Sequence, residues 1–195
     1  PFKCYFYPPA FDKEKLPIPF LLPPGGSNLM NIVSMMPKLK EELRTIFNDY
    51  GLKYVFDTNS QEIKVMKEKK PGAIFLIPFH SIADTLQRMI FYKAAIESNS
   101  ESALVFEEPE AHSYPPFISK VTQDIIQSDR NQFFITTHSP YVVNDFLELP
   151  SDELAIYLVD FRNGETFVKR ASDTEVQEMY EYGIDLFFNT ETFLR

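Results

Sequence analysis

The sequence predicts an α/β fold with a mainly parallel sheet flanked by helices, and three observations predict it. From residue 73 onward, apolar segments alternate in the order strand, helix, strand, helix, strand, which is typical of parallel strands with right-handed crossovers. Two of the strands, Ala103–Phe106 and Gln132–Thr137, read as buried on both faces, so helices are expected to cover both faces of their sheet. Polar residues follow these two strands roughly 30 residues apart, the length of one strand–helix–strand unit.

The composition is that of a globular protein. The chain has 195 residues, of which 44% are hydrophobic and 24% charged. Its formal charge of -9 argues against a broad nucleic-acid surface, because phosphate affinity comes mainly from Lys and Arg. Cys4 is the only cysteine, which excludes an internal disulfide. No apolar run approaches the ~20 residues that cross a bilayer, and no secretory signal is seen, so a cytoplasmic location is expected.

Residues 1–72 are expected to form a variable subdomain of loops, a helix and a hairpin. The chain begins with a stretch crowded with Pro and aromatic residues, which favours extended or looped backbone. From residue 28 to 50 the apolar residues fall at helical spacing, and Pro37 is expected to break or kink this helix. Two short strands follow at 52–57 and 62–67.

Residues 73–195 are expected to carry the functional half of the fold. A strand at 73–77 leads to a helix over 82–97, where Ser81 and Asp84 have the spacing of a capping pair. The remaining expected elements are a strand at 103–106, a helix at 116–127, a strand at 132–137, a helix at 141–147, a hairpin of 154–161 with 166–170, and a helix at 173–182.

Acidic residues and a histidine follow the two apolar strands. Glu107 and Glu108 come directly after the first strand, and His138 follows the second. If the strands are parallel neighbours, these residues meet at one edge of the sheet, where ligands of open α/β sheets bind. Adjacent residues leaving a strand point in different directions, so one glutamate could hold Mg²⁺ while the other orients or deprotonates a water. A histidine there could sense a phosphate.

These segments resemble two motifs of the ABC-type P-loop ATPases. The run from Ala103 to His112, with its EEPEAH ending, is similar to their Walker B strand, and Thr136–Pro140 is similar to the switch-histidine motif of the group. Relatives include chromosome-maintenance and RecF-like ATPases and OLD-type nucleases. The resemblance implies that Glu107 is the magnesium ligand and that Glu108 is the catalytic glutamate. It also implies that His138 is the catalytic γ-phosphate switch.

The helix at 82 begins where the family has its signature segment, which binds nucleotide across the dimer. The resemblance therefore implies that Ser81, Asp84 and Arg88 are cofactor-binding residues. Two departures are present: Glu107 replaces the usual Asp, and Ser-Ile-Ala-Asp replaces the usual Ser-x-Gly pattern. A helix N-terminus attracts phosphate through its free N–H groups, whereas the charge of Asp84 would repel a phosphate unless Asp84 caps the helix.

The chain contains no G-x-x-x-x-G-K-[ST] loop. That loop supplies the backbone cradle and the lysine for the β- and γ-phosphates. We therefore expect this sequence to be the C-terminal part of a longer ATPase with the phosphate loop upstream. The resemblance implies hydrolysis of ATP with Mg²⁺ in an ATP-dependent homodimer, inactivity of the isolated chain, and nucleic-acid contacts, if any, through other parts of the parent protein.

Two other functions remain open from the sequence. The missing loop and Asp84 also fit a regulatory or interaction module that kept the fold without nucleotide chemistry. The alternative is a divalent-metal hydrolase site in a nuclease-associated ATPase, formed by Glu107, Glu108, Glu110, His112 and His138.

Overall fold

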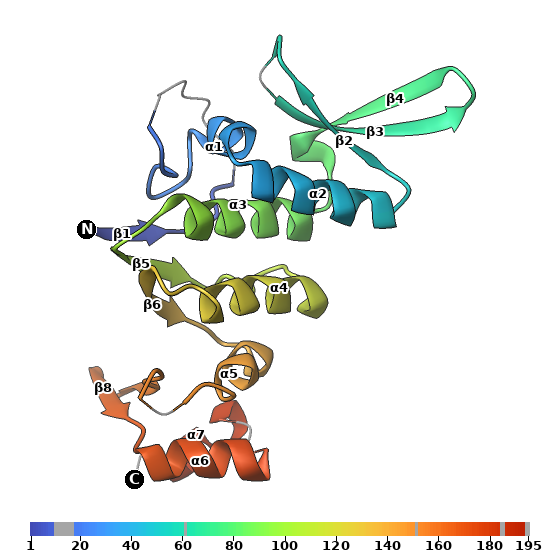
Figure 1. Ribbon diagram of the computed structural model, residues 1–195. Coiled ribbons are helices and arrows are strands. Elements are labelled where there is room, and N and C mark those ends of the chain that lie inside the picture. The colour runs from blue at the N-terminus through green and yellow to red at the C-terminus, as the bar shows by residue number, and fades with distance from the viewer. Residues whose placement is uncertain (10–17, 61, 151, 184–185, 194–195) are drawn as a thin grey trace. The chain divides into compact units, whose positions relative to one another are not determined.

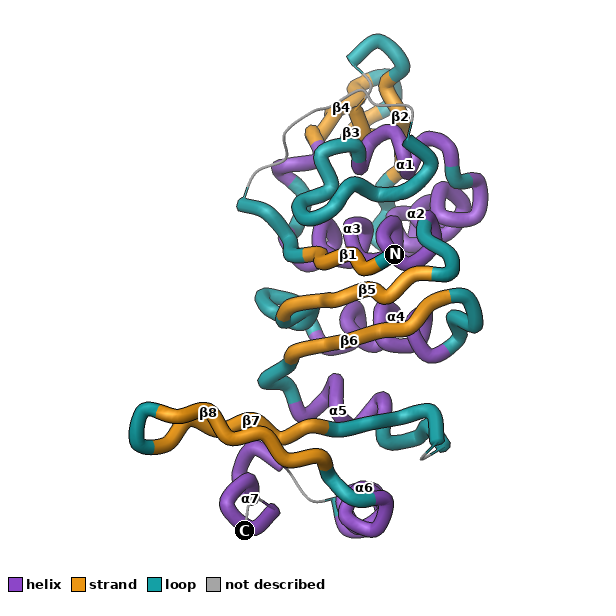
Figure 2. Tube along the Cα trace, turned by 90° about the vertical axis from the view of Figure 1, so that its left-hand side faces the viewer, coloured by secondary structure: helices purple, strands orange, loops and turns teal. Residues whose placement is uncertain are grey.

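Three strands from distant parts of the chain form a parallel sheet in the computed structural model (Figure 1). They are β1 (Phe2–Tyr5), β5 (Ser102–Glu107) and β6 (Asn131–Thr136), in the order β1-β5-β6. Figure 2 shows the three strands side by side. The prediction that the two apolar strands are parallel neighbours is confirmed. β1 had not been predicted as a third strand of their sheet.

The structure describes residues 1–9, 18–60, 62–150, 152–183 and 186–193. These residues belong to two units, Pro1–Thr136 and Thr137–Arg195, and the fold of each is given by itself. None of the described helices is long and apolar enough to span a membrane.

Two helices, α3 (Asp84–Ser98) and α4 (Pro115–Ile126), cover one face of the parallel sheet (Figures 1 and 2). On that face Leu104 and Phe106 are fully buried, and the Phe106 ring lies 5.1 Å from that of Tyr92 on α3. Side chains on the opposite face are open: Phe2 is 68% and Phe134 is 48% exposed, and their rings lie 6.3 Å apart. Within the first unit, helices therefore cover only one face of this sheet, and the expectation that helices cover both faces is not met there.

The first unit also contains an antiparallel sheet packed near two helices. α1 (Leu29–Met35) and α2 (Pro37–Asp49) are separate helices, because Pro37 starts the second one as predicted. The sheet has the order β2-β3-β4, with β2 (Lys53–Asp57), β3 (Glu62–Lys70) and β4 (Ala73–Pro78).

The strand at residues 73–77 does not begin the parallel sheet, as its place in the alternating pattern had suggested. β4 pairs antiparallel with β3, because the chain reverses at Pro71-Gly72, where Gly72 has φ 84°. This hairpin joins residues on both sides of the division expected at residue 72. The chain then enters a 3₁₀ turn, η1 (Phe79–Ser81), which leads to α3.

The second unit is a hairpin packed on helices. It contains α5 (Pro140–Phe146), β7 (Tyr157–Arg162), β8 (Glu165–Arg170), α6 (Asp173–Tyr182) and α7 (Leu186–Phe193). The predicted Asn163-Gly164 turn is confirmed, with positive φ at both residues, as a two-residue hairpin turn requires. α7 had not been predicted. The buried core consists of Leu147, Leu158, Ala171, Val176, Met179, Leu186 and Phe193.

A capping box starts α6, and its loss is expected to destabilise the helix. Ser172 Oγ accepts the Glu175 N–H at 3.2 Å, and a Glu175 carboxylate oxygen accepts the Ser172 N–H at 2.8 Å. Ser172→Ala should cost about 1 kcal/mol. Native-state hydrogen exchange of the α6 amides should then quicken about fivefold. Thr174→Ala is the control, because Thr174 is exposed in the same turn; an equal effect there would contradict the capping role.

Candidate functional site

The acidic pair lies where two neighbouring parallel strands end. Glu107 is the last residue of β5 and stands opposite Thr136, the last residue of β6. The Glu107 side chain is exposed, while its carbonyl oxygen accepts the Tyr92 hydroxyl at 3.4 Å. Glu107 is therefore available to a ligand at the carboxyl edge of the sheet, while Tyr92 anchors its backbone to α3.

Glu108 is held in an unusual backbone conformation. Its φ of 41° lies in the left-handed region, which is uncommon for a residue other than glycine and costs about 1–3 kcal/mol. Its N–H donates to the Thr136 carbonyl at 2.9 Å, and its own carbonyl accepts the Ala111 N–H at 3.0 Å. Backbone hydrogen bonds on both sides thus fix this half-buried glutamate. Strain of this kind motivates a functional hypothesis for Glu108.

Tyr92 is a hydroxyl donor beneath the acidic residues. Burial, together with the smaller effect of the Glu110 and Glu107 charges, raises the pKa of Tyr92 to about 12. The hydroxyl therefore stays protonated at neutral pH and keeps its bond to the Glu107 carbonyl.

The predicted capping of α3 by Ser81 and Asp84 is wrong. The residue that caps the helix is Ala83, and no side chain accepts a cap hydrogen bond there. Ser81 ends the preceding 3₁₀ turn and is exposed. Asp84 instead accepts a hydrogen bond from Arg88 Nε at 2.9 Å, one turn along the helix. The Asp84 charge that was expected to repel phosphate is therefore offset by Arg88.

Arg88 is fixed by a residue from the beginning of the chain. Its guanidinium carbon lies 4.5 Å from the centre of the Tyr7 ring, a cation–π arrangement, and its side chain is only 14% exposed. The Tyr7 hydroxyl donates to Gln87 Oε1 at 2.9 Å. Burial raises the pKa of Tyr7, and the Asp84 charge adds to that rise. No pattern in the sequence connects Tyr7 to this helix, so the sequence could not reveal it.

Thr85 connects the start of α3 to the loop that follows the acidic pair. Its Oγ1 accepts the Tyr114 N–H at 3.1 Å, just before α4 begins. The described structure thus brings Glu107, Glu108 and the loop after them into one unit with the start of α3. Sequence reasoning missed Thr85, because a single threonine on a helix carries no signal of a long-range partner.

His138 belongs to the second unit and follows the end of β6 by two residues along the chain. The side chain is exposed, and its ring lies 6.5 Å from that of Phe187 on α7. The Ser139 N–H donates to Thr137 Oγ1 at 3.0 Å, in the turn before α5. The convergence of His138 with Glu108 stays a prediction.

The residues at the sheet edge fit a magnesium ion that is shared with a nucleotide. Among the described residues, no group of three or more His, Cys, Asp and Glu side chains could hold a metal ion. Mg²⁺ does not require such a group, since it usually binds one or two carboxylates together with water and substrate phosphates. The exposed Glu107 carboxylate suits that mode of binding.

The comparisons with known proteins agree with this architecture. A family model described as "AAA domain, putative AbiEii toxin, Type IV TA system" matches residues 27–144, more than half of the chain. A solved structure described under "Structural biochemistry of ATP-driven dimerization and DNA stimulated activation of SMC ATPases" matches with a TM-score of 0.51 and 15% identity. The match covers 78% of this chain and 96% of the other. Curated proteins give no match.

The structural likeness shows that the chain has the α/β fold of the SMC and ABC-type ATPases, with a parallel sheet flanked by helices. The family match begins just before α1 and ends within α5. It therefore contains β5 and β6, together with Glu107, Glu108 and His138. The chain therefore belongs to this AAA-domain family of P-loop ATPases.

Proposed function

We propose that the chain forms the C-terminal portion of an ABC-type ATPase and supplies the residues that hydrolyse ATP. The phosphate loop is provided upstream in the parent protein, because the 195 residues contain no such motif. The parent converts ATP to ADP and phosphate and works in the cytoplasm as an ATP-dependent homodimer.

One observation carries the proposal: a strained glutamate stands at the carboxyl end of a parallel strand. β5 and β6 are parallel neighbours, and Glu108 follows β5 with φ 41° while its N–H bonds to the last residue of β6. The carboxyl edge of a parallel sheet is where α/β proteins bind nucleotides. Residues with strained backbone conformations persist where the surrounding structure fixes them, and they are frequent at active sites.

The two glutamates take different roles in this proposal. The Glu108 carboxylate orients the attacking water and accepts its proton, as a general base. Glu107 holds Mg²⁺, which neutralises charge on the β- and γ-phosphates when it is bound. His138 hydrogen-bonds the γ-phosphate and reports its presence.

The start of α3 contacts the nucleotide of the second subunit in a head-to-tail dimer. Ser81 and the first N–H groups of α3 face the phosphate, since a helix N-terminus favours anions. The ion pair with Arg88 lowers the repulsion from Asp84. The solved structure that matches this fold is described in terms of ATP-driven dimerization, which supports a dimer of this kind.

Replacing Glu107 tests the proposed metal position. In the parent ATPase, Glu107→Gln should raise the Mg²⁺ concentration for half-maximal hydrolysis by about 10–100-fold, since an amide is a weaker ligand for a hard cation. Magnesium titrations of ATPase rate measure this. Glu101→Gln is the control. Glu101 is exposed and precedes the first residue of β5, at the end of the strand away from Glu107, so this substitution should leave the Mg²⁺ requirement unchanged. An unchanged Mg²⁺ requirement in the Glu107 variant would remove this residue from the metal site.

A further inference from the structure

A buried lysine joins three helices of the first unit. Lys93 on α3 is 1% exposed, and its Nζ donates to Glu42 Oε1 of α2 at 2.7 Å and to the Asp124 carboxylate of α4. Glu42 is 39% and Asp124 is 23% exposed, so the lysine is the most deeply buried of the three. We call Lys93, Glu42 and Asp124 the lysine triad.

The contacts of the lysine triad disfavour a shift of α3 along its own axis. A charge without a partner in the protein interior is very costly, whereas apolar surfaces can slide past each other at smaller cost. A shift of α3 by one turn, about 5.4 Å, would remove Lys93 from both carboxylates at once. Burial also raises the pKa of Asp124, which agrees with a desolvated position for this carboxylate of the lysine triad.

The helices joined by the lysine triad also lead to the candidate site. α3 begins at Asp84, and α4 begins directly after the loop that contains Glu108. A second connection lies at the other end of this helix pair, where the Tyr114 N–H bonds to Thr85 Oγ1. The helices α3 and α4 are therefore linked in two places. A hydrogen bond joins the start of α3 to the 107–114 loop, and the lysine triad joins the two helices farther along.

We propose that the lysine triad is a positioning device that holds the start of α3 in fixed register with the loop carrying Glu108. The inference rests on the proposed function, in which Glu108 acts on the nucleotide of its own subunit and the start of α3 contacts that of the partner. Holding the two segments together sets the geometry of both nucleotide sites of the dimer. Lys93 itself touches no reacting atom.

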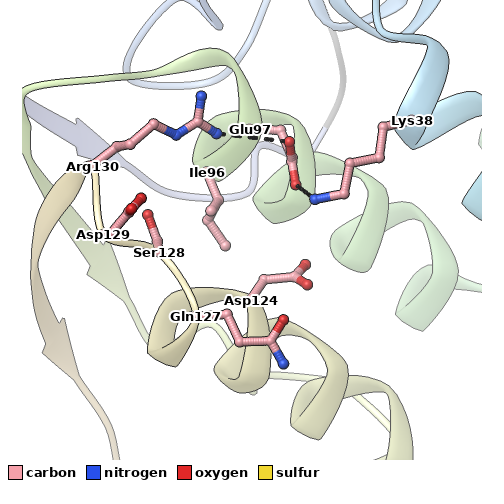
Figure 3. A pocket seen from close by; sticks show the side chains of 8 residues that line it. All are labelled: Lys38, Ile96, Glu97, Asp124, Gln127, Ser128, Asp129 and Arg130. Carbon is pink, nitrogen blue, oxygen red and sulfur yellow. Dashed lines mark hydrogen bonds and ion pairs between the residues drawn. The ribbon is translucent and has the colours of Figure 1, made fainter.

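A neighbouring ion pair provides a matched control. Lys38 on α2 bonds to Glu97 on α3 at 2.6 Å, and Arg130 lies 3.9 Å from Glu97 (Figure 3). These side chains line an open cavity of about 130 Å³. The pair joins α2 to α3 as the lysine triad does, but Lys38 is 79% exposed. Exposed pairs contribute little, so Lys38→Met should leave the register of α3 unchanged.

Hydrogen exchange on the 195-residue chain tests the register directly. In Lys93→Met, amides at the start of α3 and in the 107–114 loop should exchange at least about tenfold faster, and both segments should change together. Lys38→Met should match the parent. Unchanged protection of both segments in Lys93→Met, or faster exchange confined to the turn around residue 93, would overturn the proposal.

Kinetics in the parent ATPase test the consequence for the site. Misplacement of a catalytic segment by about 1 Å can cost about 10²-fold in rate, so kcat of Lys93→Met should fall by ~10–100-fold with KM little changed. A purely structural role would lower the melting temperature and leave kcat intact at lower temperatures, which would count against positioning. If the parent protein shows no ATPase activity, the proposed function is rejected. The exchange experiment still tests whether the lysine triad holds α3 in register.

A fully apolar joint keeps the test decisive if Lys93→Met does not fold. Replacing a whole buried ion cluster with apolar residues of similar size is often tolerated, whereas removing one partner is not. The triple variant Glu42→Leu, Lys93→Met, Asp124→Leu should therefore fold but still show faster exchange at both segments and a reduced kcat. A triple variant with parental exchange and kcat would mean that packing alone sets the register, and the positioning role would be rejected.

Discussion

Replacing Glu108 with glutamine in the parent ATPase is expected to lower the hydrolysis rate by ~10²–10⁴, the usual contribution of a general base. The amide keeps the size of the side chain and can still hold a water, but it cannot accept the proton. Glu108 is also anchored by backbone bonds to Thr136 and Ala111, so the substitution should not rearrange the loop. ATP binding should therefore persist while turnover is lost.

Two measurements separate this result from a general loss of structure. Equilibrium binding of Mg-ATP should remain within a few-fold of the parent, since Glu108 acts on the water and not on the bound phosphates. Size-exclusion chromatography should show a dimer that accumulates with ATP, because hydrolysis is the step that releases the partners. Hydrolysis at the parental rate would exclude Glu108 as the base, and Glu101→Gln should behave like the parent in both assays.

The parallel pair β5–β6 could be predicted because local and global signals agreed there. Each segment is short and apolar, each ends in polar residues, and the connecting segment has the length of one crossover helix. The break between α1 and α2 could also be predicted from Pro37, because proline is compatible with the first turn of a helix and not with its interior.

The predictions that failed depended on partners far away in the sequence. The alternating pattern placed the 73–77 strand in the parallel sheet, but its hydrogen bonds go to β3, which the reversal at Gly72 brings alongside. The strand that does complete the sheet comes from residues 2–5, about 100 positions before its partner β5. Four residues in a proline-rich stretch carry too little periodicity to reveal such a pairing.

The candidate site divides in the same way. Residue type and spacing made Glu107, Glu108 and His138 candidates, because nucleotide hydrolysis requires such side chains at strand ends. They could not reveal the left-handed backbone of Glu108, which results from bonds to β6 and to the following loop. The stacking of Tyr7 on Arg88 and the burial of Lys93 are likewise tertiary, and each joins residues more than 30 positions apart.

The 195-residue chain by itself is expected to bind Mg-ATP no more tightly than the millimolar range. Phosphate contacts supply much of nucleotide affinity, and the loop whose backbone N–H groups and lysine make those contacts is not in the sequence. The start of α3 is no substitute, because Asp84 and Arg88 there neutralise each other and one helix end offers few N–H donors. Isothermal titration calorimetry measures this, with the parent protein as the positive control; a shift from micromolar to millimolar corresponds to about 4 kcal/mol of binding energy. Micromolar binding to the chain alone would require a second phosphate cradle within these residues, and the division of labour proposed between this chain and an upstream loop would then be wrong.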